Sequence, residues 1–165
     1  MLPEEVKNLV GKVLSTSKFE VEKQSIKRFA EAVGDKNPLY RDEEYARKSR
    51  YGSIIAPPGF ISSVWFWEDT SGQTPETTAL KSTGLLGLML TLAEAGYPNI
   101  IDSGIDYEFF HPVRAGDTLK STVVIKDIRE RKSEEGNLVF LITDTSYTNE
   151  NGDEVAKTRW TTIHR

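Results

Sequence analysis

Three polar side chains in one short turn are the residues of this chain whose types and spacing suggest chemistry. The turn spans residues 34–40 and reads Gly-Asp-Lys-Asn-Pro-Leu-Tyr. Asp35 carries a carboxyl group that can exchange a proton with a substrate, and the phenol of Tyr40 can donate a hydrogen bond. Asn37 is of a type that stabilises turns. We therefore take Asp35 and Tyr40 as candidate catalytic residues and Asn37 as their structural support.

Each of these residues also has a purely structural interpretation. Asp35 lies after a predicted helix and shortly before an Asn-Pro pair, where aspartate commonly does no more than shape a turn. Tyr40 can equally be an aromatic residue that packs in the core and forms a hydrogen bond through its hydroxyl. Its ordinary pKa near 10 makes it a poor general base at neutral pH. Both interpretations stay open at the level of the sequence.

Two predicted helices position this turn. Apolar residues recur at helical spacing over Gln24–Val33, and the glycine that follows is the residue type that most often ends a helix. The segment Gly59–Trp67 follows two prolines, which suit the first turn of a helix, and is apolar nearly all round. A helix without a polar face is usually buried. Further segments are predicted as helices at Pro3–Val13, Glu43–Ser49 and Gly84–Gly96 and as a loop at Ser71–Ser82.

The last third of the chain changes to the alternation of apolar and polar residues that is typical of strands. A brief strand is also predicted around Phe19 and Val21. The predicted C-terminal strands are Ile100–Phe110, Thr118–Arg129, Leu138–Tyr147 and Val155–Ile163. Helices first and an antiparallel meander last indicate an α+β protein. A curved antiparallel sheet wrapped around the apolar helix Gly59–Trp67 would have the hot-dog fold.

Composition excludes several classes of function. With 165 residues the chain is expected to form one domain, residues 1–165. A net charge of −4 argues against nucleic-acid binding, and the absence of cysteine excludes disulfides and thiolate metal sites. Its two histidines show no metal-binding spacing, so no metal is expected. The apolar run Leu85–Leu92 is too short to span a bilayer and the N-terminus lacks a secretory pattern, so we expect a cytoplasmic protein without a membrane partner.

Two motifs resemble the MaoC-like (R)-specific enoyl-CoA hydratases and dehydratases. The first combines Gly34-Asp35-x-Asn37-Pro38-Leu39 with Ile54-Ile55-Ala56, and the second is Phe110-x-Pro112-Val113-x-x-Gly116-Asp117. The resemblance extends from about Phe19 to the end of the chain and implies the hot-dog fold. Ile55-Ala56-Pro57-Pro58-Gly59-Phe60, with an aromatic-rich helix behind it, is similar to the N-terminal module of two-module family members. In that branch the module is often degenerate and pairs with a second, catalytic hot-dog.

The resemblance also implies roles for single residues. Asp35 matches the family's catalytic aspartate and Asn37 the asparagine of the turn, whereas Tyr40 stands where the family has histidine. The expected oxyanion donor is altered as well, because Pro57 and Pro58 replace a His-Gly pair and proline has no N–H. Gly59 remains as a candidate donor. The candidate substrate-binding residues are Arg50, Tyr51, Phe60 and Trp65.

The functional expectation is a subunit of an enoyl-CoA hydratase or 3-hydroxyacyl-CoA dehydratase, a lyase of fatty acid metabolism. This hot-dog would shape the acyl-CoA site beside a catalytic MaoC subunit, with acyl-CoA or enoyl-CoA as substrate and no cofactor. A hetero-oligomer is expected, and a homodimer stays open. The alternatives are a homodimeric hydratase that uses Asp35 and Tyr40, an acyl-CoA thioesterase, and a non-enzymatic acyl-CoA-binding module.

Overall fold

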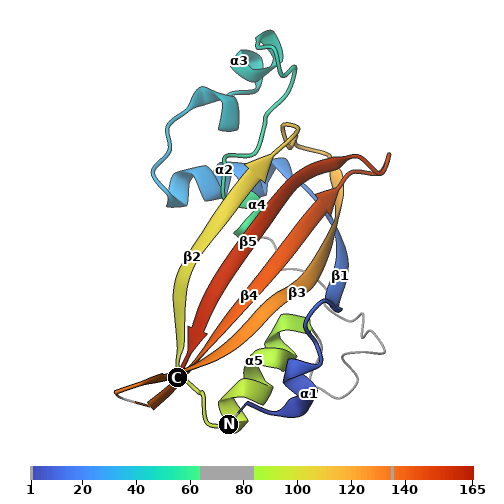
Figure 1. Cartoon of the computed structure of the whole chain (residues 1–165). Helices are drawn as coiled ribbons and strands as arrows, with labels where there is room; N and C mark the ends of the chain where they lie inside the picture. Colours follow the sequence, from blue (N-terminus) through green and yellow to red (C-terminus); the bar gives the residue numbers. More distant parts are fainter. Residues whose placement is uncertain (1, 64–83, 135) are drawn as a thin grey trace.

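The computed structural model describes residues 2–63, 84–134 and 136–165. A single antiparallel sheet runs through it, with the strands in the order β1-β3-β4-β5-β2 (Figure 1). The long central strands β3 and β4 form a hairpin, and β5 joins β4 to the edge strand β2. The strands are β1 (Val13–Glu20), β2 (Ile100–Phe109), β3 (Thr118–Ser133), β4 (Gly136–Thr148) and β5 (Glu154–His164).

Alternation of side chains gives this sheet a buried face. Along β4, Val139, Leu141 and Thr143 are buried while the residues between them are half-buried. Bulges interrupt the pairing of β3 with β4 between Ile125 and Asp127, and of other strand pairs, and such bulges increase the local twist of a sheet. The strands can therefore curve around the apolar side chains that cover one face of the sheet.

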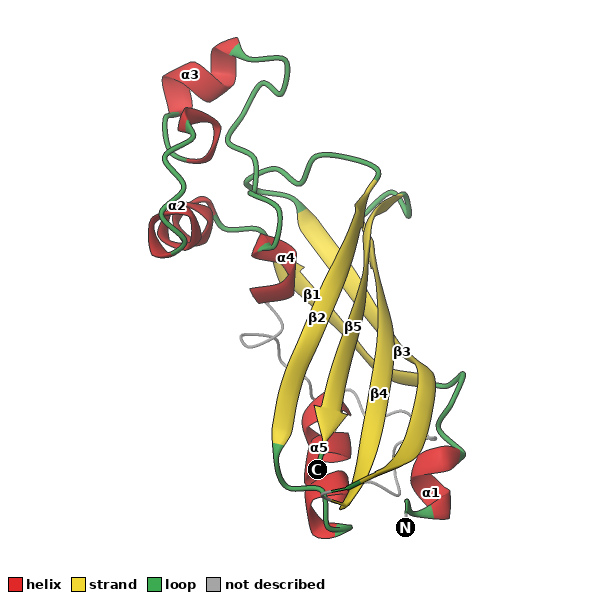
Figure 2. Cartoon of the chain, turned by 60° about the vertical axis from the view of Figure 1, so that its left-hand side comes forward, coloured by secondary structure: helices red, strands yellow, loops and turns green. Residues whose placement is uncertain are grey.

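The helices lie in two groups near opposite ends of the sheet (Figure 2). Near one end are α2 (Lys23–Ala32), the 3₁₀-helix η1 (Pro38–Tyr40), α3 (Glu43–Lys48) and α4 (Phe60–Ser63). Near the other end are α1 (Glu4–Lys7) and α5 (Gly84–Glu94). Each group buries its own apolar cluster against the sheet: Ile26, Phe60 and Ala156 belong to the first, and Leu88 and Ile125 to the second.

Most predicted elements are confirmed, with changed boundaries. The helix predicted at Gln24–Val33 is α2, and the four C-terminal strands are β2 to β5. The helix predicted at Pro3–Val13 is wrong beyond Lys7, because Gly11 turns the chain with a φ of 81° and donates its N–H to Ile125 O of the sheet. The brief strand predicted near Phe19 therefore begins earlier, at Val13.

The apolar helix predicted at Gly59–Trp67 is described only in its first turn. This turn is α4, where Phe60 and Ile61 are 2% and 1% exposed, as expected for a helix start enclosed by the sheet. The rest of that helix and the predicted loop Ser71–Ser82 lie outside the described residues. The helix predicted at Gly84–Gly96 is confirmed as α5. Within the described ranges, no helix has both the length and the apolar character needed to cross a bilayer.

Candidate active site

The turn after α2 is built from side-chain hydrogen bonds to the backbone. Gly34 ends the helix with a φ of 74°, and the next N–H, that of Asp35, donates to Ala30 O at 2.8 Å. Asp35 Oδ1 then accepts from the backbone N–H of Asn37 at 2.9 Å. Asn37 Oδ1 in turn accepts from the N–H of Leu39 at 3.0 Å and caps η1. Both polar residues of the motif therefore hold the chain in shape through their side-chain oxygens.

Tyr40, at the end of this turn, is buried and protonated at neutral pH. Its side chain is 9% exposed. Burial is the main cause that raises the pKa of Tyr40 above its ordinary value; the charge of Asp35 and the neighbouring Tyr51 raise it further, and a hydrogen bond with Asn37 lowers it. A tyrosine in this state can donate a hydrogen bond to a ligand, whereas it cannot take a proton from water at neutral pH.

A cleft of about 460 Å³ opens beside Tyr40. Tyr51 and Arg50 lie on its wall, and Arg50 Nη2 donates to the hydroxyl of Tyr51 at 2.6 Å. The backbone of Tyr51 is fixed by Arg114 Nε, which donates to its carbonyl oxygen at 3.2 Å. The remaining walls are apolar for the most part and come from Ile55, Ala56, Pro57, Pro58, Ile61, Phe109, Phe110, His111, Pro112 and Val113.

Gly59 is a backbone donor at the start of α4. Pro57 and Pro58 have no N–H, and the N–H of Phe60 already donates to Pro57 O at 3.1 Å. No acceptor for the Gly59 N–H is found among the described residues. Gly59 has a φ of 88°, and an added Cβ would lie 3.8 Å from the hydroxyl oxygen of Tyr107. That hydroxyl shares a 2.6 Å hydrogen bond with Ser62 Oγ, so a polar group stands close to the free donor.

The structure brings only part of the predicted site together. Tyr40, Arg50 and Tyr51 line the cleft, whereas Asp35 and Asn37 do not. Phe60 is also absent from the lining of the cleft. It packs edge to face on Phe29 with ring centroids 5.8 Å apart. Trp65 lies outside the described residues.

Phe110 and the Pro112–Val113 pair are walls that the site prediction did not include. The signal for them in the sequence is the second motif, which the resemblance to the family singles out without assigning it a role in the site. Val113 O accepts from Ala56 N at 2.8 Å, and Ala115 N donates to Ile54 O at 3.0 Å. These bonds fasten the second motif to the segment before α4 and so connect the two motifs in space.

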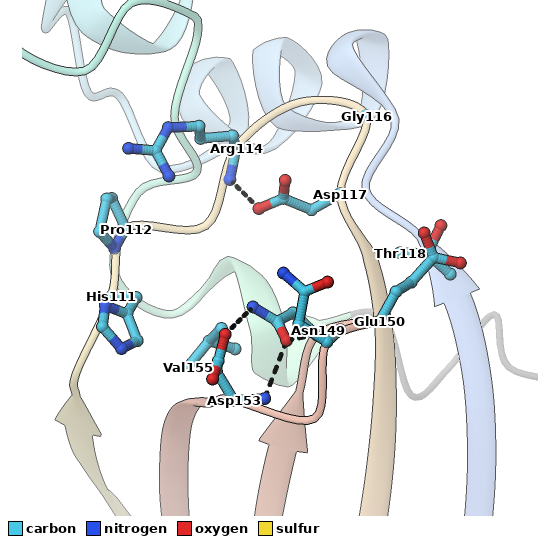
Figure 3. Close-up of a pocket in the computed structure, with 11 residues that line it drawn as sticks. His111, Pro112, Arg114, Gly116, Asp117, Thr118, Asn149, Glu150, Asp153 and Val155 are labelled. Carbon is cyan, nitrogen blue, oxygen red and sulfur yellow. Dashed lines mark hydrogen bonds between the residues drawn. The ribbon is translucent and has the colours of Figure 1, made fainter.

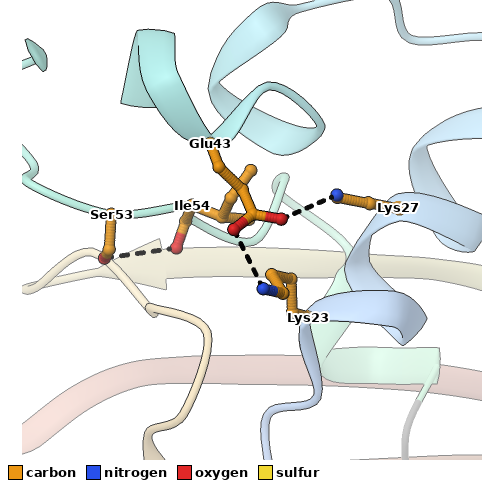
Figure 4. A network of polar contacts seen from close by, with 5 residues as sticks. All are labelled: Lys23, Lys27, Glu43, Ser53 and Ile54. Carbon is orange, nitrogen blue, oxygen red and sulfur yellow. Dashed lines mark hydrogen bonds and ion pairs between the residues drawn. The ribbon is translucent and has the colours of Figure 1, made fainter. Parts of the chain in front are cut away.

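Two further clefts flank this region and are polar. One, of about 390 Å³, lies between the 111–118 turn and the β4–β5 turn, where Arg114 N donates to Asp117 Oδ2 at 2.7 Å and Asn149 Oδ1 accepts from Asp153 N at 2.9 Å (Figure 3). The other measures about 640 Å³ and contains Glu43, which accepts from Lys23 at 3.0 Å (Figure 4).

Some of the polar groups in both clefts bond to one another or to neighbouring side chains. A second bond, from Lys27 at 3.2 Å, also reaches Glu43. The hydrogen bond from Lys23, followed by that from Lys27, lowers the pKa of Glu43. Nowhere in the described ranges do three His, Asp or Glu side chains gather as a metal site would require.

Residues 8–158 match the family model described as "FAS1-like, dehydratase domain region". The chain belongs to this MaoC-like dehydratase family. The predicted family is thus confirmed, and the match includes the turn, the cleft, strands β1 to β4 and the start of β5.

Relatives of this MaoC-like chain include proteins of two kinds. A UPF0336 protein of Streptomyces coelicolor is 35% identical over 157 residues, which cover 94% of this chain and 91% of that protein. A probable enoyl-CoA hydratase alpha subunit of Thermomonospora curvata is 30% identical over 136 residues, which cover 82% of this chain and 42% of that protein. The chain therefore spans less than half the length of this second relative.

The fold of the MaoC-like chain also matches solved structures. The ChsH1–ChsH2 complex of Mycobacterium tuberculosis contains a chain that superposes with a TM-score of 0.73 at 19% identity, covering 97% of this chain and 88% of that one. At 19% identity this structural similarity shows a shared fold and nothing further. It confirms the prediction of an α+β hot-dog with a curved antiparallel sheet.

Proposed function

We propose that this chain is the accessory hot-dog of a MaoC-like enoyl-CoA hydratase or 3-hydroxyacyl-CoA dehydratase and works beside a subunit that supplies the general base. The observation that carries the proposal is Tyr40, which is buried, has a raised pKa and stands where the family pattern has histidine. Hydration requires a base that activates water for attack at Cβ while a proton reaches Cα. A protonated phenol does not perform the first of these tasks at neutral pH.

The state of Asp35 supports the same conclusion. One of its carboxylate oxygens accepts a hydrogen bond from the turn backbone, and the residue is not among those that line the cleft. Taken with Tyr40, this leaves the cleft without a described carboxylate or imidazole in the expected Asp/His arrangement. The histidine among the residues that line it, His111, is exposed and belongs to the later motif.

The cleft suits a role in holding substrate. Its apolar walls fit an acyl chain, and Arg50 at its side carries the fixed positive charge that phosphate groups of coenzyme A favour. Gly59 is not among the residues that line the cleft, but its N–H has no acceptor in the described ranges and lies at the start of a helix segment, where a thioester oxygen would find a donor. We infer that the chain contributes these walls and contacts, with no cofactor of its own.

The relatives point in the same direction without deciding the role. One of them is named a probable enoyl-CoA hydratase alpha subunit, and a structural neighbour comes from a complex of two differently named chains. A named alpha subunit implies a partner subunit for that relative. We extend this to the present chain as a proposal: its partner is a second hot-dog that carries an intact Asp-x-Asn-Pro-x-His sequence.

The test is turnover of crotonyl-CoA and longer enoyl-CoAs by three samples. These are the chain alone, a MaoC-like subunit with the intact motif from the same genome, and the two together. We expect turnover in the mixture, with none from the chain alone, and no change on Asp35→Asn in this chain. Robust turnover by the chain alone that disappears in Asp35→Asn would instead identify an autonomous hydratase. Release of free thiol from saturated acyl-CoA would identify a thioesterase, and binding without turnover in any sample would identify a binding module.

A further inference from the structure

Two phenols share the cleft beside α4, and each keeps a proton that it can donate. Tyr40 and Tyr51 both line this cleft, and both pack in the apolar cluster that contains Phe60 and Ala156. Tyr51 is one of the causes that raise the pKa of Tyr40, so the two side chains are close enough for one to affect the ionisation of the other. A phenol oxygen can accept a hydrogen bond while its O–H donates another.

Arg50 determines in which direction the hydroxyl of Tyr51 bonds. Arg50 Nη2 donates to the phenol oxygen at 2.6 Å, and a guanidinium group has no acceptor, so Tyr51 keeps its own proton. The guanidinium carbon also lies 4.8 Å from the centroid of the Tyr51 ring. A hydrogen bond received from a cation strengthens the bond that the same hydroxyl donates. Among the described residues, no acceptor for the Tyr51 proton is found.

The side chain of Asn37 has the corresponding role for Tyr40. Asn37 Oδ1 already accepts from the N–H of Leu39 at 3.0 Å, which leaves the amide NH₂ group to donate to the phenol oxygen. The hydrogen bond with Asn37 lowers the pKa of Tyr40, which is the effect of a bond donated to the phenol oxygen. Tyr40 therefore accepts from Asn37, and the described part of the chain offers its own proton no acceptor.

The backbone around both phenols is fixed by hydrogen bonds within the protein. Tyr51 N donates to Ser49 Oγ at 3.1 Å, and Tyr51 O accepts from Arg114 Nε at 3.2 Å. The carbonyl group just before the other phenol, Leu39 O, accepts from Ile55 N at 3.3 Å. Donors that are held in place before a ligand arrives bind an acceptor at a small cost in conformational entropy.

The surroundings of the two phenols favour a neutral oxygen over an anion. The charge of Asp35 raises the pKa of Tyr40, and a second negative charge at this phenol would be disfavoured for the same reason. The other walls of the cleft are apolar for the most part, as at Ile61 and Phe109. Positions 57 and 58 on these walls are prolines and provide no backbone N–H. A carbonyl or hydroxyl oxygen of a ligand therefore suits the two phenol donors.

We propose that Tyr40 and Tyr51 together bind one uncharged carbonyl or hydroxyl oxygen in the acyl group of an acyl thioester. This inference rests on the proposed function, because it names the part of the acyl-CoA that the cleft recognises. The oxygen belongs either to the thioester carbonyl or to a substituent further along the acyl chain, and both present the same lone pairs to the phenols. A ligand without such an oxygen forgoes both hydrogen bonds and binds more weakly.

The first experiment compares ligands that differ in their oxygen atoms. Butyryl-CoA has the thioester carbonyl, S-butyl-CoA is the thioether that lacks it, and 3-hydroxybutyryl-CoA has a further hydroxyl on the chain. Each ligand is titrated by calorimetry into the wild type, Tyr40→Phe, Tyr51→Phe and the double variant, which keep the rings and remove the hydroxyls. The matched control is Tyr45→Phe, at a phenol that is 52% exposed and does not line the cleft, and it should behave as the wild type.

The expected result depends on the ligand. A ligand that supplies the acceptor should bind each single variant about fivefold more weakly than the wild type, equivalent to about 1 kcal/mol for one hydrogen bond. S-butyl-CoA should bind the wild type and the double variant equally. Weaker binding of both oxygen-bearing ligands identifies the thioester carbonyl as the acceptor, and weaker binding of 3-hydroxybutyryl-CoA alone identifies the substituent. The same change for all ligands, or no change for any of them, would overturn the proposal.

The second experiment observes the hydrogen bonds at the ligand. Infrared difference spectroscopy measures the C=O stretch of bound butyryl-CoA labelled with carbon-13 at the thioester and of bound 3-oxobutyryl-CoA labelled at the ketone. We expect a lowered frequency for one of these carbonyls in the wild type and in Tyr45→Phe, and a return toward the unbound value in Tyr40→Phe and Tyr51→Phe. A phenol that only packs in the wall would leave the frequency unchanged. Unshifted carbonyls in both ligands would overturn the proposal.

Failure of this inference and failure of the proposed function give different results. Binding that does not depend on either phenol, by a chain that still supports turnover with a catalytic subunit, would refute the inference alone. Phenol-dependent binding by a chain that never supports turnover would refute the function alone. The titrations are repeated on the mixture with the catalytic subunit, and a lack of binding of every CoA ligand in both samples would overturn the two together.

Discussion

His164 makes the stability of this protein depend on pH in a range where few other groups titrate. The side chain is 0% exposed near the end of β5. Its Nε2 lies 3.0 Å from Thr162 Oγ1, and its Nδ1 has no partner among the described residues. Burial lowers the pKa of His164 below 6.5, so the folded protein keeps this ring neutral. In the unfolded chain the ring is solvated and binds a proton near its ordinary pKa.

The magnitude follows from proton linkage. Below the unfolded pKa of 6.5 the unfolded chain binds one proton more than the folded one, so the free energy of unfolding falls as pH falls. Each pH unit in this range corresponds to about 1.4 kcal/mol per proton. With the folded ring neutral, lowering the pH from about 7.5 to about 5 should therefore reduce the free energy of unfolding by about 2 kcal/mol through His164 alone. Above the unfolded pKa this contribution is fully present.

The assay is urea unfolding at several pH values between these limits. The variants His164→Leu and His164→Gln cannot take up the proton and should lose most of the pH dependence that the wild type shows. Glu43, Glu130 and Asp144 have lowered pKa values and titrate below this range in all the proteins. The matched control is His111→Gln at the other, exposed histidine, which should retain the wild-type slope. If both His164 variants lose stability as steeply as the wild type, the reasoning is refuted.

Three smaller predictions concern the turn and the start of α4. Asp35→Ala removes the acceptor for the Asn37 N–H and should lower the free energy of unfolding by about 1 kcal/mol, whereas Asp35→Asn keeps an acceptor and should change it far less; equal losses in urea unfolding would contradict the role of Asp35 in the turn. Gly59→Ala should lower the free energy of unfolding by about 1–2 kcal/mol, because alanine is strained at a φ of 88°. A steric clash is not the reason, since the nearest atoms to an added Cβ are 3.7 and 3.8 Å away. An unchanged free energy of unfolding would contradict this and show that the backbone relaxes. Tyr40 has a raised pKa, so the wild type should lose stability as pH rises above 10, and Tyr40→Phe should lose less; identical alkaline curves would argue against a buried, protonated phenol.

The helices and strands of this fold can be predicted from local sequence patterns, whereas the contacts between distant segments cannot. The strands β2 to β5 were predictable because alternation along each of them reports a face that packs on a core. The helix expected at Pro3–Val13 failed at Gly11, where the chain bonds to the backbone of β3. That contact joins residues more than a hundred positions apart, and no pattern within the N-terminal segment contains it.

The candidate site shows the same division. The types of Asp35, Asn37 and Tyr40 marked the turn, and their spacing was enough to predict that a turn forms there. A packed Tyr40 was one of two interpretations of the sequence, and the structure confirms it; the choice could not be made from the turn alone, because burial depends on Ile55 and other residues from distant segments. The lack of an acceptor for the Gly59 N–H among the described residues likewise depends on where α4 begins, which two adjacent prolines leave undetermined by a residue or two.

The turn that carries the hydratase-like motif has a consequence for how such motifs persist. Asp35 and Asn37 each accept a backbone N–H group, so the bend between α2 and η1 needs a short side chain with an oxygen at both positions whether or not a reaction takes place beside it. Selection for folding alone then favours Asp or Asn at both positions, while the position of Tyr40 is free to exchange an imidazole for a phenol. A descendant that has lost its chemistry would still display most of the signature. The motif as a whole therefore identifies proteins that share the shape of this turn. The side chain at its last position, here Tyr40, bears on whether the turn can supply a general base.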